Sequence, residues 1–347
     1  MGDVLHAMPA VAALRELHPE WRIDWAIEPA WGELLETRAG GPRAVRDARR
    51  PLVDTRISVL TRKWKRRPWT EKTVREILAL RERLRTGSYD LCVDMQGSIR
   101  SAIVGRIAGA ADFVGPAEPR ERQAAWLYRR KVRVTAAHVV EQGCELLGAA
   151  IGEKLQPAKV MLPVDSVAEA WCDSMLSEVG QQFVLIAPTA GWGAKQWPAE
   201  RYGALAAALA EAGFRTLVNT SSVEDAVSNR VVETSHGAAV LAHCSVGEMI
   251  ALVRRAALVV AGDTGPLHLA AALERPVVGL YGPTDPARNG PYGTQSLVLR
   301  HPSSRLDHSR HPETEKGLLE ITVDEVAKAA LELLGVRQNA GEDKVAL

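Results

Sequence analysis

The pattern of hydrophobic and polar positions along the chain predicts strands and helices that alternate. Short apolar runs bounded by turn residues predict strands, and apolar residues at helical spacing predict helices. The expected strands cover residues 21–28, 89–94, 183–187, 214–219, 238–242, 257–261 and 276–280. The expected helices cover 2–17, the stretch after Gly97 to about Gly109, 136–150, 199–212, 224–234, 245–256, a segment reaching Leu273, and a last helix. This last helix begins at Thr322, which is expected to be its N-cap, with Glu325 three residues later.

The alternation occurs in two halves. Residues 152–165 hold Pro157 and Pro163 and predict a link between the halves. Strands that alternate with helices pair in parallel, with helices on both faces of the sheet. The sequence therefore predicts an α/β chain of two doubly wound halves.

The first half begins unusually, with Met1-Gly2-Asp3 opening a helix at once. A doubly wound half normally begins with a central strand that leads into such a helix. One hypothesis is that a strand and turn of roughly ten residues precede this start. The alternative is a first domain that lacks this strand.

Composition narrows the class of protein. The net charge of the 347 residues is +1, which predicts no partner of uniform high charge and no nucleic acid. No apolar run is long enough to span a bilayer, so any membrane contact is expected to be peripheral. The four cysteines are widely spaced and are expected to be buried reduced thiols in a cytoplasmic protein, without a zinc site. They are Cys92, Cys144, Cys172 and Cys244.

The most informative motif is the segment 263–268, Asp-Thr-Gly-Pro-Leu-His, which directly follows an apolar run. A second turn, residues 281–286, follows the next apolar run. The carboxyl ends of parallel strands are where such sheets bind ligands, and the first turn of a helix attracts phosphate. Gly265 would allow a ligand to approach the backbone closely. The alternative is an ordinary strand-turn-helix with Asp263 or Thr264 as the N-cap.

Two further residues are candidates for catalysis. Asp3 stands at a helix start, where a carboxylate can remove a proton from a hydroxyl or can simply cap the helix. Lys195 ends a glycine-bearing loop, residues 188–198, and a lysine suits a diphosphate leaving group. A surface lysine in a loop is the alternative there.

Basic residues are concentrated at 62–67 and again at 120–133. Such runs are usually solvated helix faces, but Trp64 and Trp69 among the charges favour contact with a membrane surface or an anionic glycolipid. No nucleic-acid motif accompanies the charge. The turn at 94–97, Asp-Met-Gln-Gly, either lines an acceptor pocket or only reverses the chain.

Taken together, these segments resemble glycosyltransferase family 9, and within it the heptosyltransferases of lipopolysaccharide core synthesis. The resemblance covers about residues 1–335 and rests on the order and spacing of several short motifs. They are 1–6, 62–66, 94–97, 120–131, 195–198, 263–268 and 281–286.

The resemblance implies a GT-B fold, in which two Rossmann-like domains face a cleft. It implies an acceptor-binding domain over 1–160, without its first strand, and a nucleotide-sugar domain over 166–320. Residues 321–335 would form a helix that packs back on the first domain, and 336–347 a disordered tail.

The implied activity is inverting transfer of heptose from ADP-heptose to the inner Kdo sugar of Kdo-lipid A, at the cytoplasmic face of the inner membrane, with no metal and no cofactor. Asp3 would be the base, and Lys195 would contact the departing ADP. The remaining donor contacts implied are Thr189, Glu224, Cys244, Asp263, Thr264, Gly265 and His268. Those implied for the acidic acceptor are Arg62, Lys63, Lys65, Arg66, Gln96 and Arg120. Cys244 departs from the family, which usually has Met near the adenine.

Overall fold

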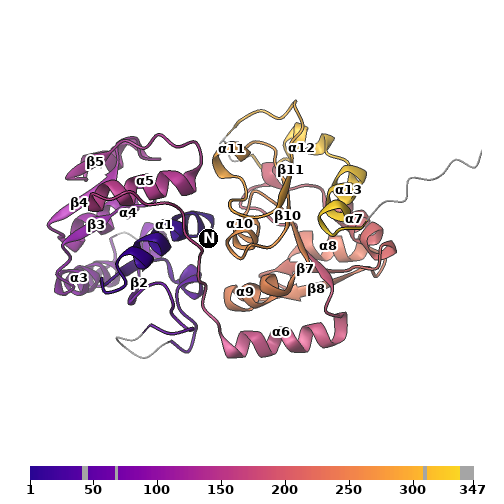
Figure 1. Cartoon of the computed structure of the whole chain (residues 1–347), viewed down its shortest axis with the longest axis horizontal. Coiled ribbons are helices and arrows are strands. Elements are labelled where there is room, and N and C mark those ends of the chain that lie inside the picture. The colour runs from indigo at the N-terminus through magenta and orange to yellow at the C-terminus, as the bar shows by residue number, and fades with distance from the viewer. Residues whose placement is uncertain (41–45, 67–68, 308–310, 337–347) are drawn as a thin grey trace, which may run out of the picture. The chain divides into compact units, whose positions relative to one another are not determined.

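The chain folds into two compact units that meet in sequence between Val164 and Asp165 (Figure 1). The computed structural model describes residues 1–40, 46–66, 69–307 and 311–336. The tail expected over 336–347 therefore lies outside the described residues, apart from Val336. Both units are built from parallel strands alternating with helices, as the hydrophobic pattern predicts.

The second unit contains one continuous sheet of six parallel strands in the order β11-β10-β9-β6-β7-β8. The strands are β6 (Phe183–Ala187), β7 (Arg215–Thr220), β8 (Ala239–His243), β9 (Leu258–Gly262), β10 (Val277–Leu280) and β11 (Ser296–Leu299). The chain adds β7 and β8 on one side of β6, then returns to add β9, β10 and β11 on the other side. The order of the strands thus reverses between β6 and β9, and a crevice opens at such a point in doubly wound sheets.

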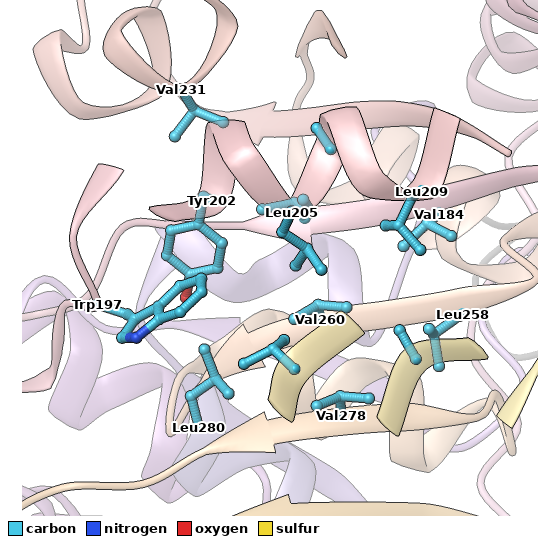
Figure 2. Packing of buried hydrophobic residues seen from close by; sticks show 14 of the residues in the cluster. Val184, Trp197, Tyr202, Leu205, Leu209, Val231, Leu258, Val260, Val278 and Leu280 are labelled. Carbon is cyan, nitrogen blue, oxygen red and sulfur yellow. The ribbon is translucent and has the colours of Figure 1, made fainter. Parts of the chain in front are cut away.

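Helices cover this sheet on both faces. They are α6 (Ser166–Val179), α7 (Ala199–Glu211), α8 (Ala226–Thr234), α9 (Val246–Arg255), α10 (Gly265–Ala272), α11 (Pro286–Asn289), α12 (Lys316–Glu320) and α13 (Val323–Leu333), with the 3₁₀ turn η3 (Gly193–Lys195). Figure 2 shows one buried layer, in which Leu205 and Leu209 of α7 lie over Val184, Val260 and Val278 of the strands. Alternate strand residues share this layer because side chains alternate between the faces of a strand. The result is a dry core, with every labelled side chain almost fully buried.

The last helix, α13, belongs to this same core. Val326, Ala329 and Ala330 are buried in the cluster formed by α7 and the strands. Thr322 caps the helix as the sequence predicts, through a capping box with Glu325. The apolar face of this helix therefore completes the core of the second unit, and the expectation that the helix packs back on the first domain stays a prediction.

In the first unit, the strands of the described residues form two separate parallel sheets. One pairs β1 (Asp24–Ile27) with β2 (Thr55–Ser58). The other has the order β3-β4-β5, formed by β3 (Leu91–Val93), β4 (Asp112–Pro116) and β5 (Arg130–Val132). The helices are α1 (Gly2–Leu17), α2 (Thr61–Arg66), α3 (Glu71–Thr86), α4 (Ile99–Ala108) and α5 (Val139–Ile151), with 3₁₀ turns η1 (Pro29–Leu34) and η2 (Arg122–Trp126).

An ion pair fixes α1 within this unit. The Arg15 guanidinium, only 6% exposed, donates to Asp54 at 2.6 Å and to the carbonyl oxygen of Leu52 at 3.2 Å. These bonds tie the end of α1 to the approach to β2. Asp54 in turn accepts from the backbone N–H of Ile23 at 2.8 Å, just before β1. Because the helix is anchored at this end, its first turn, which carries Asp3, has a defined position in the unit.

The four cysteines are free thiols, three of them buried and Cys92 partly buried, in agreement with the prediction. Among the described residues, no helix combines the length and the apolar character needed to cross a bilayer.

Candidate active site

The predicted donor residues of the second unit lie at the carboxyl ends of four strands. Thr189 follows β6, Glu224 follows β7, Cys244 follows β8 and Asp263 follows β9. Since the strand order is β9-β6-β7-β8, these four positions follow one another along the carboxyl edge of the sheet. The sheet topology thus brings together residues that are up to 74 positions apart in sequence.

Lys195, Asp263 and His268 form a buried, charged cluster at the point where the strand order reverses. Lys195 Nζ lies 2.5 Å from Asp263 Oδ2, and His268 Nε2 lies 3.0 Å from Asp263 Oδ1. The side chains of Asp263 and His268 are only 6% and 5% exposed, and that of Lys195 is 14% exposed. The loop at 188–198 and the turn at 263–268, which the sequence singled out separately, are therefore joined by this cluster.

The cluster holds Asp263 in its charged form. Burial alone would raise the pKa of this carboxyl, but the hydrogen bond from His268 and the charge of Lys195 outweigh it and lower the pKa well below its usual range. Because it is ionised, the carboxylate can orient both a lysine and a histidine. The Lys195 ammonium is therefore held in position before a phosphate binds. A preorganised cation stabilises a developing negative charge without first having to reorient.

Contacts from distant parts of the chain fix the loop of Lys195. The Lys195 ammonium lies 4.7 Å from the centre of the Trp192 ring, a cation–π contact. Ala194 donates to the carbonyl oxygen of His311 at 3.1 Å, and Thr314 donates to that of Gln196 at 2.9 Å. The sequence did not identify Trp192 or the segment 311–315 as part of the site. An aromatic residue between Gly191 and Gly193 was the only available signal.

Two glycines make this close packing feasible. A Cβ on Gly193 would lie 1.6 Å from the carbonyl oxygen of Pro312, and one on Gly262 would lie 2.9 Å from that of Lys195. Both distances are shorter than atoms tolerate, so no larger residue fits without movement. Gly262 is the last residue of β9, and its lack of a side chain lets the Lys195 loop lie against the strand end.

The first turn of α10 is the second feature of this edge. Thr264 occupies the N-cap position, but its hydroxyl donates to the carbonyl oxygen of Gly262 at 3.2 Å and makes no capping bond to the helix. Thr264 is therefore the N-cap residue, one of the two that the alternative interpretation of this turn named, but it makes no side-chain capping bond. The turn instead offers a backbone without a side-chain cap, next to the Lys195 ammonium. This arrangement suits an anionic ligand such as a diphosphate.

Glu224 and Cys244 differ in their surroundings. Glu224 is exposed in the turn after β7, where an outward carboxylate is open to a polar ligand. Cys244 is buried, and its sulfur accepts from the side-chain amide of Asn219 at 3.0 Å. The two positions lie at neighbouring strand ends. Their contact with the donor stays a prediction.

The first unit brings together the predicted catalytic Asp3 and two predicted acceptor residues. Gln96 Nε2 donates to Asp3 Oδ2 at 3.2 Å, and Arg120 Nη1 lies 3.5 Å from the same oxygen. The Asp3 and Arg120 side chains are more than half exposed. The arrangement places a solvent-accessible carboxylate beside a cation and an amide, the groups expected for a base next to an acidic acceptor.

The carboxylate of Asp94 holds the turn that carries Gln96 through hydrogen bonds. Its buried carboxylate accepts from the backbone N–H of Gln96 at 3.0 Å, from that of Gly97 at 3.1 Å and from the Tyr128 hydroxyl at 2.8 Å. Gly97 has φ +68°, and a Cβ there would lie 3.1 Å from the backbone nitrogen of Arg120. The tight turn that the sequence left open thus serves to present Gln96 and Arg120 together.

The basic run at 62–66 forms α2, which has no buried residue. Arg62 lies over the Trp31 ring at 5.8 Å from its centre, and Lys63 is paired with Glu76 at 2.5 Å. Lys65 and Arg66 are exposed. Lys63 thus shares its charge with Glu76, and the contact of this run with the acceptor stays a prediction.

The described residues include no group of three His, Cys, Asp or Glu side chains arranged to hold a metal ion. The prediction of catalysis without a metal or cofactor stays a prediction.

Comparison with known proteins identifies the family. Residues 77–318 match glycosyltransferase family 9 (heptosyltransferase). The chain belongs to this family. It is also 30% identical over 312 residues to lipopolysaccharide heptosyltransferase 1 of Escherichia coli strain K12, covering 88% of this chain and 92% of that protein. This family 9 member is therefore a glycosyltransferase.

Solved structures support the fold. E. coli heptosyltransferase WaaC with ADP superposes with a TM-score of 0.76 at 26% identity, covering 96% of this chain and 97% of that one. The same enzyme with ADP-2-deoxy-2-fluoro heptose gives a TM-score of 0.73. These matches confirm the expected α/β class, GT-B with two Rossmann-like units.

Proposed function

We propose that this family 9 glycosyltransferase moves L-glycero-D-manno-heptose from ADP-heptose to the inner Kdo sugar of Kdo-lipid A, with inversion at the anomeric carbon. The proposed binding of the donor rests on the Lys195–Asp263–His268 cluster, which lies where the strand order of the second sheet reverses. The names of the relatives support the reaction, since they include lipopolysaccharide heptosyltransferase 1 and a structure that holds an ADP-heptose analogue.

The donor is bound, in this proposal, along the carboxyl edge of the second sheet. Lys195 and the first turn of α10, with Thr264 and Gly265, hold the diphosphate. Thr189 contacts the same group. Glu224 holds the ribose and Cys244 borders the adenine. His268 and Asp263 keep Lys195 in place and border the heptose.

The reaction step follows from these roles. Asp3 takes the proton of the acceptor hydroxyl, whose oxygen forms a bond to the anomeric carbon of heptose. The bond from that carbon to the diphosphate oxygen breaks, and ADP leaves with the electron pair. Lys195 and the N–H groups of α10 stabilise the charge that grows on ADP, where such groups contribute most.

The acidic acceptor is held by the basic groups of the first unit. Arg120 and Gln96 adjoin Asp3, and Arg62, Lys65 and Arg66 lie exposed or at the surface of α2, with Lys63 as a weaker contributor. Guanidinium groups suit carboxylates and phosphates. An acceptor that carries such groups would be drawn to this surface.

The test of the base is Asp3→Asn. We expect turnover to fall by about 10²–10⁴-fold, while the Kd for ADP-heptose, measured by calorimetry, stays unchanged. Glu16→Gln is the matched control, since Glu16 is an exposed carboxylate on the same helix. Turnover of Asp3→Asn within a few fold of the unaltered enzyme would remove the base assignment.

The same assay distinguishes the alternatives for the acceptor. ADP release is measured with Kdo-lipid A, with Kdo-lipid A that already carries one heptose, and with neither. Release only with the second acceptor indicates heptosyltransferase II activity. Tight binding of ADP-heptose without release in any case indicates a non-catalytic binding protein.

We also propose that the enzyme associates peripherally with the cytoplasmic face of the inner membrane, where a lipid-linked acceptor resides. Trp126 is 80% exposed and Trp69 is 92% exposed, and each has basic residues near it in sequence. Exposed tryptophan beside basic groups favours an anionic membrane surface. Trp126→Ser should reduce sedimentation with vesicles of anionic phospholipid, and unchanged sedimentation would count against the proposal.

A further inference from the structure

The indole ring of Trp192 lies against the cation that is proposed to bind the donor diphosphate. The Lys195 ammonium is 4.7 Å from the centre of this ring. Asp263 accepts from the same ammonium through Oδ2 at 2.5 Å and through its backbone carbonyl oxygen at 3.4 Å. An ammonium has three N–H donors, and the Lys195 side chain is only 14% exposed. A phosphate oxygen that binds this ammonium must therefore take the place of one of these contacts.

The contact with Asp263 is the harder of the two to replace. The Asp263 carboxylate is 6% exposed and also lies 3.0 Å from His268 Nε2, so it is held from two sides. Separating it from Lys195 would leave a buried negative charge without its cation, which is strongly destabilising. Asp263 is therefore expected to keep its contact with Lys195 when a ligand binds.

The contact with the Trp192 ring is the easier one to replace. The ring attracts the ammonium through its π face, whereas an ionised phosphate oxygen forms a charge-assisted hydrogen bond, which is stronger. Trp192 is also only partly buried, in contrast to Trp197 of the same loop, which is 1% exposed. Exchange of the ring for a phosphate oxygen thus gives Lys195 a better partner.

The loop allows the ring to move while Lys195 stays in place. A Cβ on Gly191 would meet no atom within 4 Å, so the chain just before Trp192 is open. The chain just after it is fixed, because Gly193 packs closely on Pro312 and the backbone N–H of Lys195 donates to the Trp192 carbonyl oxygen at 3.2 Å. Rotation about the side-chain bonds of Trp192 can therefore withdraw the ring without disturbing the backbone of η3.

We propose that the Trp192 ring occupies the position at the Lys195 ammonium that the donor diphosphate takes, so that the donor displaces the ring when it binds. This inference rests on the proposed function, which names Lys195 as the diphosphate contact. The ring holds the ammonium while the site is empty, and its displacement uses part of the binding free energy. Trp192 therefore weakens the affinity for ADP and favours the release of ADP after transfer.

The first test is Trp192→Leu, which keeps an apolar side chain but removes the π face. We expect the Kd for ADP, measured by calorimetry without acceptor, to fall by about 2–30-fold. Trp192→Phe should give an intermediate Kd, because the face of phenylalanine attracts a cation less strongly. Trp171→Leu is the matched control, since it removes a partly buried indole from α6 of the same unit and should leave the Kd unchanged. An equal or higher Kd for Trp192→Leu would overturn the proposal.

A double variant separates displacement from simple crowding. In a Lys195→Met background, the ring and the phosphate have no ammonium to compete for, so adding Trp192→Leu should leave the Kd for ADP unchanged. Tighter binding by the same factor with and without Lys195 would show that the ring only takes up space beside the ligand. That result would reject the proposed competition for Lys195.

Fluorine NMR of the unaltered chain labelled with 5-fluorotryptophan follows the ring directly, even if the variants do not fold. The Trp192 resonance is assigned with Trp192→Phe and should shift on saturation with ADP. The resonance of Trp197, whose Nε1 donates to the carbonyl oxygen of Ile321 at 3.0 Å, should stay in place. A stationary Trp192 resonance would overturn the proposal.

The outcome for Trp192 is separable from that of the proposed function. An enzyme that shows all these effects with ADP, yet releases no ADP from ADP-heptose with Kdo-lipid A, would refute the transferase assignment and leave the role of Trp192 intact. Normal turnover with an unchanged Kd in Trp192→Leu would do the reverse. Absence of any ADP binding by the unaltered enzyme would refute both.

Discussion

The two units use the same alternation of strands and helices but differ in how their strands pair. The second unit has a continuous sheet in which β6 and β9 each pair on both sides, with a dry core above it. In the described part of the first unit, five strands form two sheets, with a cavity of about 920 Å³ between β1 and β3. In a continuous sheet each central strand exchanges hydrogen bonds with two neighbours. In the first unit this pairing is interrupted between β1 and β3.

The candidate site residues of the two units also differ in burial. In the second unit, Lys195, Asp263 and His268 are buried and closely paired. In the first unit, Asp3 and Arg120 are more than half exposed, and their closest approach is 3.5 Å. A buried, preorganised charge cluster suits the stabilisation of a charged leaving group. A solvent-exposed pair suits a bulky acceptor, because the acceptor can reach it from solution.

The largest effect expected from this comparison is on the two cores. Leu209→Ala removes a fully buried side chain from the dry core of the second unit, and we expect a loss of about 2–5 kcal/mol of stability. Leu91→Ala makes the same chemical change beside the cavity, where the side chain already lacks neighbours on one side, and we expect about 1 kcal/mol. Amide hydrogen exchange in β6 reports the stability of the second unit, and exchange in β3 reports that of the first. Equal losses would mean that the first core is packed as well as the second.

The next effect concerns the charge cluster. Lys195→Met should reduce turnover by about 10²–10³-fold, as expected when a group that stabilises a developing negative charge is lost. It also leaves Asp263 buried without its cation, which destabilises the second unit. The double variant Lys195→Met with Asp263→Asn removes both charges, so we expect stability to recover and turnover to stay low.

The matched control is Lys328→Met, an exposed lysine of the same unit, which should leave turnover unchanged. Turnover is followed by ADP release, and stability by thermal unfolding. A double variant that regains normal turnover would show that Lys195 serves the fold and not the leaving group.

Much of the fold was predictable because it depends on local patterns. The buried strands of the second unit were found from continuous apolar runs, and Thr322 was found as a cap from its spacing to Glu325. The position of α13 was not predictable, since an amphipathic helix does not specify which unit its apolar face covers. Trp192 was missed for a similar reason, because its ring acts on a lysine three residues away only in a loop held by residues 311–315.

The sequence by itself determined the alternation of elements, the strand-end turns and the residue types suited to a base, a leaving group and an acidic acceptor. These follow from periodicity and side-chain chemistry, which are local. Only the tertiary structure decided that Lys195 and Asp263 meet, that Asp94 holds the turn of Gln96, and that the edges of β1 and β3 border one cavity. Strand order and packing decide such contacts, because they join residues tens of positions apart through a sheet that no short segment of sequence encodes.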